Sequence, residues 1–293
     1  MSRIHDALKK AEQDRSIFER IGIDIEAPAE MPVAGPIPVT PATDTVRPQM
    51  PAVSSISDPI TLDTVSTRSA PTVWAPDTKT MLFFGSEEST HGTEQFRALR
   101  SQLYQLREKQ PLRKILVTSS VPGEGRSFVA ANLAQVMARQ PGCRALLIDA
   151  DLRNPSLHLT LGTSASPGLS EYLLGEADES GIIQRGQMEN LFFLASGRPV
   201  SGPTEIISNG RLKSIMDCLE TLFDWIIIDS PAAIPVSDSG LIANLCDGVL
   251  MVVRSNATPF DLVRKARQKF NPDRLLGVVL NGVPPEIDPQ IQY

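Results

Sequence analysis

The stretch SSVPGEGRS, residues 119–127, follows an apolar run and precedes a helix-forming run of small residues. A phosphate-binding loop of the form G-x-x-x-x-G-K-[ST] occupies this place between a strand and a helix. Gly125 and Ser127 match that form, whereas Ser120 replaces its first glycine and Arg126 replaces its lysine. Backbone N–H groups of such a loop wrap a phosphate, and the following helix N-terminus favours negative charge. Taken alone, the stretch is therefore either a phosphate site, with arginine in place of lysine, or only a glycine-rich turn.

Carboxylates follow two other apolar runs of the sequence. LLIDADLRNP places Asp149 and Asp151 after one run, and WIIIDSP places Asp229 after another. A single aspartate at a strand end is most often a structural cap, but three of them beside a phosphate loop suit Mg²⁺, which prefers oxygen ligands and retains water. The three stretches together predict a Mg-nucleotide site.

The runs around these motifs indicate the fold. Six strands are predicted, at residues 114–120, 144–151, 190–196, 225–231, 248–255 and 275–282. Their nearly continuous aliphatic character indicates burial on both faces of a mainly parallel sheet. Helical patterns lie between them, as at 127–140 and 259–270. We expect an α/β three-layer sandwich of the P-loop type over residues 81–283. No G-x-G-x-x-G turn follows the first strand, which disfavours a dinucleotide oxidoreductase.

The remaining chain divides into three expected segments. Residues 1–22 have the spacing of a short amphipathic helix, which either docks on a partner or folds back on the domain. Residues 23–80 are rich in proline without periodicity and are expected to form a disordered linker. Residues 284–293 form an expected flexible tail that carries Tyr293.

Charge and hydropathy restrict the partners. The net charge is −6, so no broad basic surface for nucleic acid is expected. The N-terminus has no apolar signal-peptide region, and no run approaches the ~18 apolar residues of a membrane span. We expect a cytoplasmic protein, and any association with a membrane would have to come through a partner.

The motifs also carry a family resemblance. PGEGRS, LLIDADLR and IIIDSP resemble the Walker A, A′ and B motifs of the bacterial tyrosine kinases, the capsular and exopolysaccharide autokinases related to ParA and MinD ATPases. EQFRALR supplies Glu94, Arg97 and Arg100 and is similar to the E-x-x-R-x-x-R subunit-contact motif of the family, although i,i+3 ion pairs on an exposed helix have the same spacing. Val121 stands where ParA and MinD proteins carry an extra lysine, which disfavours a dimer of the MinD kind.

The resemblance implies ATP and Mg²⁺ as ligands and assigns a role to each matching residue. Asp149 would lie nearest the attacking tyrosine hydroxyl, Asp151 and Asp229 would hold metal-bound waters, and Ser127 would bind Mg²⁺. Asn281 would contact adenine. The phosphates would be bound by the loop residues Pro122, Gly123, Glu124, Gly125, Arg126, Ser127 and Phe128. The implied catalytic residues are Arg126, Asp149, Asp151 and Asp229.

The resemblance further implies a homo-oligomer, formed through the helix of Glu94, Arg97 and Arg100, and activation by a transmembrane polysaccharide chain-length regulator. The expected activity is phosphorylation of a C-terminal tyrosine in a neighbouring subunit, in control of polysaccharide synthesis and export.

Two departures from the family pattern leave a second hypothesis open. Arginine keeps the charge of lysine but is larger and planar, so we expect nucleotide binding with reduced or lost phosphoryl transfer. The family ends in a tyrosine cluster, whereas this chain has Tyr293 alone, which is either the phosphate acceptor or a residue without a role. The alternative function is a weakly active or non-catalytic ATP-binding regulator of polysaccharide export.

Overall fold

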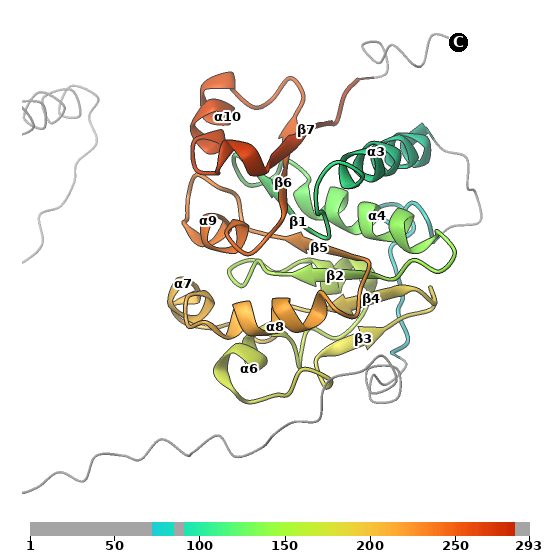
Figure 1. Ribbon diagram of the computed structural model, residues 1–293, viewed down its shortest axis with the longest axis vertical. Coiled ribbons are helices and arrows are strands. Elements are labelled where there is room, and N and C mark those ends of the chain that lie inside the picture. Colours follow the sequence, from blue (N-terminus) through green and yellow to red (C-terminus); the bar gives the residue numbers. More distant parts are fainter. Residues whose placement is uncertain (1–71, 85–90, 285–293) are drawn as a thin grey trace, which may run out of the picture. The chain divides into compact units, whose positions relative to one another are not determined.

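The computed structural model of the protein describes residues 72–84 and 91–284 (Figure 1). The expected N-terminal helix at 1–22, the linker as far as residue 71, and Tyr293 lie outside these residues. In the described part of the chain, no helix has the length and hydropathy needed to cross a membrane.

Most strands of the described chain are separated by helices, except β3 and β4, which follow each other. The strands are β1 (Lys114–Ser119), β2 (Ala145–Asp149), β3 (Ile183–Arg185), β4 (Leu191–Leu194), β5 (Trp225–Asp229), β6 (Gly248–Arg254) and β7 (Leu275–Asn281). The α-helices are α3 (His91–Arg107), α4 (Arg126–Ala138), α5 (Leu157–Leu161), α6 (Leu169–Leu174), α7 (Pro203–Ile207), α8 (Arg211–Leu219), α9 (Asp238–Ala243) and α10 (Phe260–Arg267). A short 3₁₀ helix, η1 (Pro272–Arg274), precedes β7.

All seven described strands form one sheet in the order β3-β4-β2-β5-β1-β6-β7. Every pairing is parallel except that of β3 with β4. The six predicted strands are all present, which confirms the mainly parallel sheet. The sequence prediction missed β3, a strand of three residues that pairs only with β4. The three strands that precede the motifs, β2, β5 and β1, are neighbours at the centre of the sheet.

Helices cover both faces of the sheet, as Figure 1 shows. Alternate residues of one strand point to opposite faces. Ile115 and Val117 of β1 accordingly belong to a buried cluster with α3 and α4, whereas Leu116 belongs to a second cluster with α6, α8, α9 and α10. The expected three-layer sandwich is therefore confirmed. Burial on both faces accounts for the nearly unbroken aliphatic runs of the strands.

Helix α4 lies between α3 and the sheet and is buried all round from Val129 to Ala138. Its small residues allow close approach to the strands. Two buried side-chain amides of this helix bind the backbone of the segment that precedes α3. Asn132 Oδ1 accepts the Leu82 N–H at 2.8 Å, and Gln135 Oε1 accepts the Phe83 N–H at 3.3 Å. These bonds satisfy polar groups that burial would otherwise make costly.

Residues 72–80, assigned by composition to the linker, pack against the domain. The Trp74 side chain is 1% exposed and meets the ring of Phe193 edge-on, with centroids 6.2 Å apart. A Cβ on Gly186 would lie 2.3 Å from the Trp74 ring, so this glycine makes room for the indole. The packed chain thus begins upstream of Met81. One large aromatic side chain anchors a segment whose prolines indicate a linker.

Candidate functional site

The loop between β1 and α4 has the backbone geometry of an anion site. Gly123 and Gly125 have φ values of +86° and +91°, which residues with a side chain rarely adopt. Gly125 caps α4 without a side-chain hydrogen bond, and the first turn of α4 contains no acidic residue. The first N–H groups of this thirteen-residue helix are therefore available to a negatively charged group.

Glu124 holds the loop in place through its side chain. Its carboxylate is 2% exposed and accepts the Val121 N–H at 2.8 Å, the Arg254 N–H at 3.3 Å and the Thr258 hydroxyl. The side chain thereby joins the loop to the chain that follows β6. Sequence reasoning assigned Glu124 to phosphate binding through its backbone and missed this clamp, because Arg254 and Thr258 lie 130 and 134 residues away in the chain.

Sheet register brings two of the predicted carboxylates together. Asp149 at the end of β2 pairs with Asp229 at the end of β5. The neighbour of β5 on its other side is β1, which leads into the phosphate loop. Ligands of open α/β sheets bind beyond these carboxyl ends. Three stretches far apart in the sequence therefore meet at one edge of the sheet.

Asp149 is fully buried and held by backbone donors. Its carboxylate accepts N–H groups from Leu157 at 3.1 Å, Ser156 at 3.2 Å and Asp151 at 3.2 Å. Burial raises the pKa of Asp149 to about 7 and the charge of Asp151 adds to the shift, while the three N–H donors oppose it. Such a group is suited to accept a proton near neutral pH.

Asp229 and Arg126 face each other without an ideal hydrogen bond. The Nε atom of Arg126 lies 3.8 Å from Asp229 Oδ1, which is too far for a hydrogen bond. Burial raises the pKa of Asp229 to about 8, the nearby Asp149 adds to the shift, and Arg126 opposes it. The same guanidinium donates from Nη2 to Asp151 Oδ2 at 2.5 Å. Arg126 therefore points toward the carboxylates.

The Asp151 loop is held by a network that sequence reasoning also missed. Asp151 Oδ1 accepts the N–H groups of Arg153 and Asn154, at 3.2 and 3.0 Å. The Arg153 guanidinium binds the carboxylate of Asp238, at 2.7 and 3.2 Å, and Asp238 also accepts the Thr204 hydroxyl at 2.6 Å. Asp238 is 1% exposed. This network ties the segment after β2 to α7 and α9.

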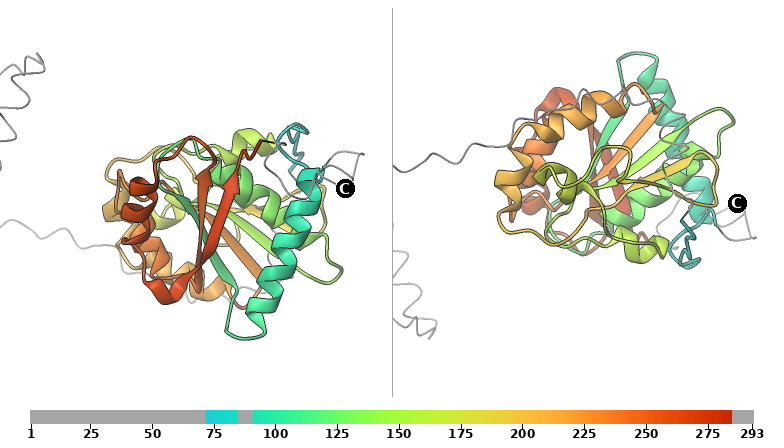
Figure 2. Two further views of the ribbon diagram at one scale, coloured as in Figure 1. Left: turned by 90° about the horizontal axis from the view of Figure 1, so that it is seen from above. Right: turned by 90° about the horizontal axis from the view of Figure 1, so that it is seen from below.

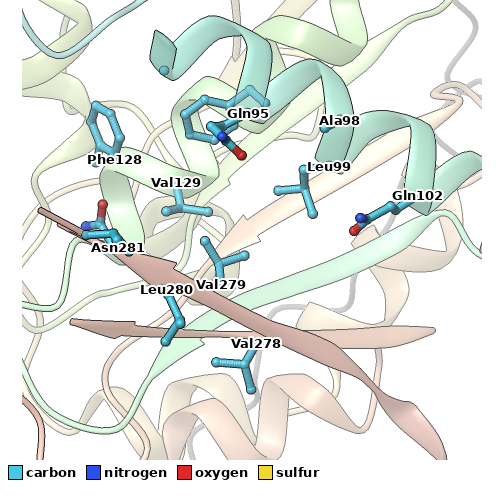
Figure 3. Close-up of a pocket in the computed structure, with 13 residues that line it drawn as sticks. Gln95, Ala98, Leu99, Gln102, Phe128, Val129, Val278, Val279, Leu280 and Asn281 are labelled. Atoms are coloured by element: carbon cyan, nitrogen blue, oxygen red, sulfur yellow. The ribbon is translucent and has the colours of Figure 1, made fainter. Parts of the chain in front are cut away.

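A cleft of about 370 Å³ lies between α3 and β7 and reaches the phosphate loop (Figure 3). Phe128 and Asn281, both expected to contact the nucleotide, line it together with Leu99 and Val279. Asn281 donates from Nδ2 to the Glu124 carbonyl at 2.9 Å. A Cβ on Gly125 would lie 2.0 Å from that nitrogen, so a side chain at this position would have to displace the Asn281 amide. Strand β7 forms one edge of the sheet (Figure 2). Val278 and Leu280 of this strand are 50% and 62% exposed.

The three residues expected at a subunit contact lie on α3 and do not all point outward. Glu94 and Arg97 form an i,i+3 ion pair on the helix surface. Arg100 instead donates from Nη1 to the Val136 carbonyl of α4 at 3.0 Å. The other tyrosines have packing roles, since Tyr172 is 3% exposed and the Tyr104 hydroxyl accepts the indole N–H of Trp225 at 3.1 Å. The acceptor Tyr293 lies outside the described residues.

The site accommodates phosphate oxygens more readily than a divalent cation. The loop offers positive φ glycines and unpaired helix N–H groups to an anion. The space between Asp151 and Asp229, where a cation would be held, already contains the Arg126 guanidinium. A metal at the predicted ligands Ser127, Asp151 and Asp229 would have to displace that guanidinium.

The fold and the loop define a P-loop α/β protein, and comparison with known proteins narrows this class. No protein-family model matches the sequence. The tyrosine-protein kinase YwqD of Bacillus subtilis is 32% identical over 199 residues, which cover 67% of this chain and 84% of that protein. The putative tyrosine-protein kinase EpsB of Ralstonia nicotianae is 34% identical over 195 residues, but the match spans only 26% of its length.

A solved structure agrees with these relatives. The crystal structure of the chimerical protein CapA2B2 superposes with a TM-score of 0.66 at 30% identity, covering 76% of this chain and 98% of that one. The chain belongs to the family of bacterial tyrosine-protein kinases, as the motifs of the sequence suggested.

Proposed function

We propose that the chain is an ATP-dependent protein-tyrosine autokinase that regulates capsular or exopolysaccharide synthesis and export. The observation that carries the proposal is the meeting of the phosphate loop with Asp149, Asp151 and Asp229 at adjacent strand ends, in a chain of the tyrosine-kinase family. The polysaccharide role rests on the resemblance of the motifs alone.

ATP would bind with its phosphates at residues 122–128 and its base toward the cleft beside α3. The loop N–H groups and the α4 N-terminus would hold the phosphate oxygens. Asn281 borders both the loop and the cleft, a position suited to an adenine contact. The apolar lining from Leu99 and Val279 suits a planar base.

The acceptor in this proposal is Tyr293 of a second subunit. A bond would form between the tyrosine oxygen and the γ-phosphorus, the bond from that phosphorus to the β-phosphate oxygen would break, and ADP would leave. Asp149 would take the hydroxyl proton, for which its raised pKa is suited. Subunits would associate through α3, where Arg97 is half-buried and forms an ion pair with Glu94 on the helix surface. A transmembrane regulator would bring the chain to the inner face of the membrane and activate it.

A second candidate function is a weakly active or non-catalytic ATP-binding regulator of the same export system. The ion pair of Arg126 with Asp151 favours it. Phosphoryl transfer depends on charges placed at the leaving oxygen, and a guanidinium held by carboxylates is turned away from that position.

Phosphopeptide mass spectrometry decides between the two candidates. The purified full chain is incubated with Mg-ATP beside two variants, Asp149→Ala and Arg126→Lys. The autokinase predicts phosphate on Tyr293 that is absent from Asp149→Ala. Phosphate in Arg126→Lys alone means that the arginine has silenced transfer and supports the regulator. ATP binding without phosphate in any sample, with the activating regulator present as well, rejects the autokinase.

A further inference from the structure

The side chain of Arg126 lies between two strand-end carboxylates. Its Nη2 is 2.5 Å from Asp151 Oδ2, and its Nε is 3.8 Å from Asp229 Oδ1. The side chains of Asp151 and Asp229 are 2% and 1% exposed, and that of Arg126 is 13% exposed. The guanidinium thus supplies positive charge to a place that water barely reaches. A buried carboxylate without such a partner is costly.

The guanidinium has the properties of a fixed cation. Its planar fork presents donors in more than one direction. One arginine can therefore face two carboxylates on different strands at once. Lysine at the same position would carry a single ammonium point charge on a shorter stem and would face them less completely.

A divalent cation would need the space that the guanidinium fills. Mg²⁺ requires near-octahedral oxygen ligands at about 2.0–2.1 Å and retains several waters. The expected hydroxyl ligand, Ser127 Oγ, lies 3.4 Å from Ser156 Oγ, and these two hydroxyls can hydrogen-bond. Within residues 72–84 and 91–284, no group of three or more His, Cys, Asp or Glu side chains is arranged to hold a metal.

We propose that Arg126 is the resident cation of this site and that the chain therefore binds a nucleoside di- or triphosphate without a divalent metal. The guanidinium stays between Asp151 and Asp229, beside the phosphate loop, and so supplies there the positive charge that a metal would otherwise supply. The inference rests on the nucleotide site of the proposed function and is independent of phosphoryl transfer.

The affinity of the full chain for a fluorescent ADP derivative, measured in excess EDTA and in excess Mg²⁺, tests the inference. The wild type is expected to bind with dissociation constants that agree within about twofold, because its counter-charge is part of the chain. Arg126→Lys frees the space between the carboxylates and is expected to bind at least roughly tenfold more weakly in EDTA than in Mg²⁺. Arg264→Lys, an exchange in an exposed ion pair on α10, is the matched control and should bind like the wild type.

The outcomes separate the inference from the proposed function. Wild-type binding that needs Mg²⁺ overturns the inference and leaves the nucleotide site intact. Absence of binding in both conditions overturns the nucleotide site, and the inference with it. The wild-type comparison decides even if Arg126→Lys does not fold, which circular dichroism would reveal. Equal metal dependence of the wild type and Arg126→Lys also contradicts a special role of arginine.

Discussion

At the scale of single residues, Gly125 links the phosphate loop to β7. Two separate features favour glycine at this position, the positive φ and the close approach of the Asn281 side chain, and each can be tested. Gly142 provides a comparison, because its φ is +72° but nothing lies within 4 Å of a Cβ there.

Gly125→Ala should therefore cost more than Gly142→Ala. The positive φ alone costs about 1–2 kcal/mol for alanine. Displacing Asn281 from the Glu124 carbonyl adds roughly 1 kcal/mol for the lost hydrogen bond. Urea unfolding measures both variants. In a protein that also carries Asn281→Ala, Gly125→Ala should destabilise the fold no more than Gly142→Ala does. If Gly125→Ala remains more costly there, the contact with Asn281 is not the reason for glycine at this position.

Asp229 should make stability depend on pH. Its pKa is raised from 3.8 to about 8, so the folded state holds a proton more tightly than the unfolded state does. The stability that this group contributes is full below pH 3.8 and is lost as the pH rises toward about 8. Asp229→Asn removes the buried charge. The free energy of unfolding of this variant, relative to that of the wild type, should therefore rise by ~1–3 kcal/mol from pH 5 to pH 8.

Urea unfolding at these two pH values gives the difference between the wild type and Asp229→Asn. Asp261→Asn is the control, because Asp261 is 72% exposed in its ion pair with Arg264, and its difference from the wild type should not change with pH. A constant difference for Asp229→Asn as well would contradict the raised pKa.

Sequence reasoning can predict which carboxylates meet, but not where Arg126 points. Asp149 and Asp229 each end an apolar strand, and parallel strands end at one edge, so their proximity follows from local patterns. The orientation of Arg126 depends on Asp151, 25 residues away, and Arg153 depends on Asp238, 85 residues away. Motif spacing contains no information on such pairings.

At the scale of elements, the long strands were predictable because burial on both faces leaves a continuous aliphatic run. The three-residue β3 has no such run and exists through its pairing with β4. Residues 72–80 were predicted to belong to the linker, but they pack against the domain. Composition averages over many residues, so the prolines outweigh a single tryptophan that fixes the segment.

Trp74→Ala should destabilise the domain by about 3–5 kcal/mol, the range for removing a large buried aromatic side chain. Val73→Ala is the matched control, because Val73 is 84% exposed, and it should cost less than about 0.5 kcal/mol. Urea unfolding monitored by far-UV circular dichroism compares them. Equal effects of the two variants would show that residues 72–80 do not anchor to the sheet.

At the scale of the whole molecule, the proposed reaction needs two chains. A Tyr293→Phe chain can donate phosphate but not accept it, and an Asp149→Ala chain can accept but not donate. Phosphate should therefore appear on Tyr293 of the Asp149→Ala chain only after the two are mixed. Mass spectrometry with one chain isotope-labelled identifies the acceptor. Arg97→Ala in both chains should slow the reaction if α3 forms the contact. If the wild type is active but no phosphate appears on the Asp149→Ala chain in the mixture, phosphate is transferred within one chain and not between two.

The central claim is that the loop after β1 is the ATP site of a tyrosine-kinase fold. Amide hydrogen exchange of the full chain with and without saturating ATP tests it most directly, because it also locates the site. We predict slower exchange at residues 121–129 and 279–283, which border the loop and the cleft, and unchanged exchange in α10 at 260–267. Unchanged exchange at residues 121–129 in saturating ATP would contradict the account.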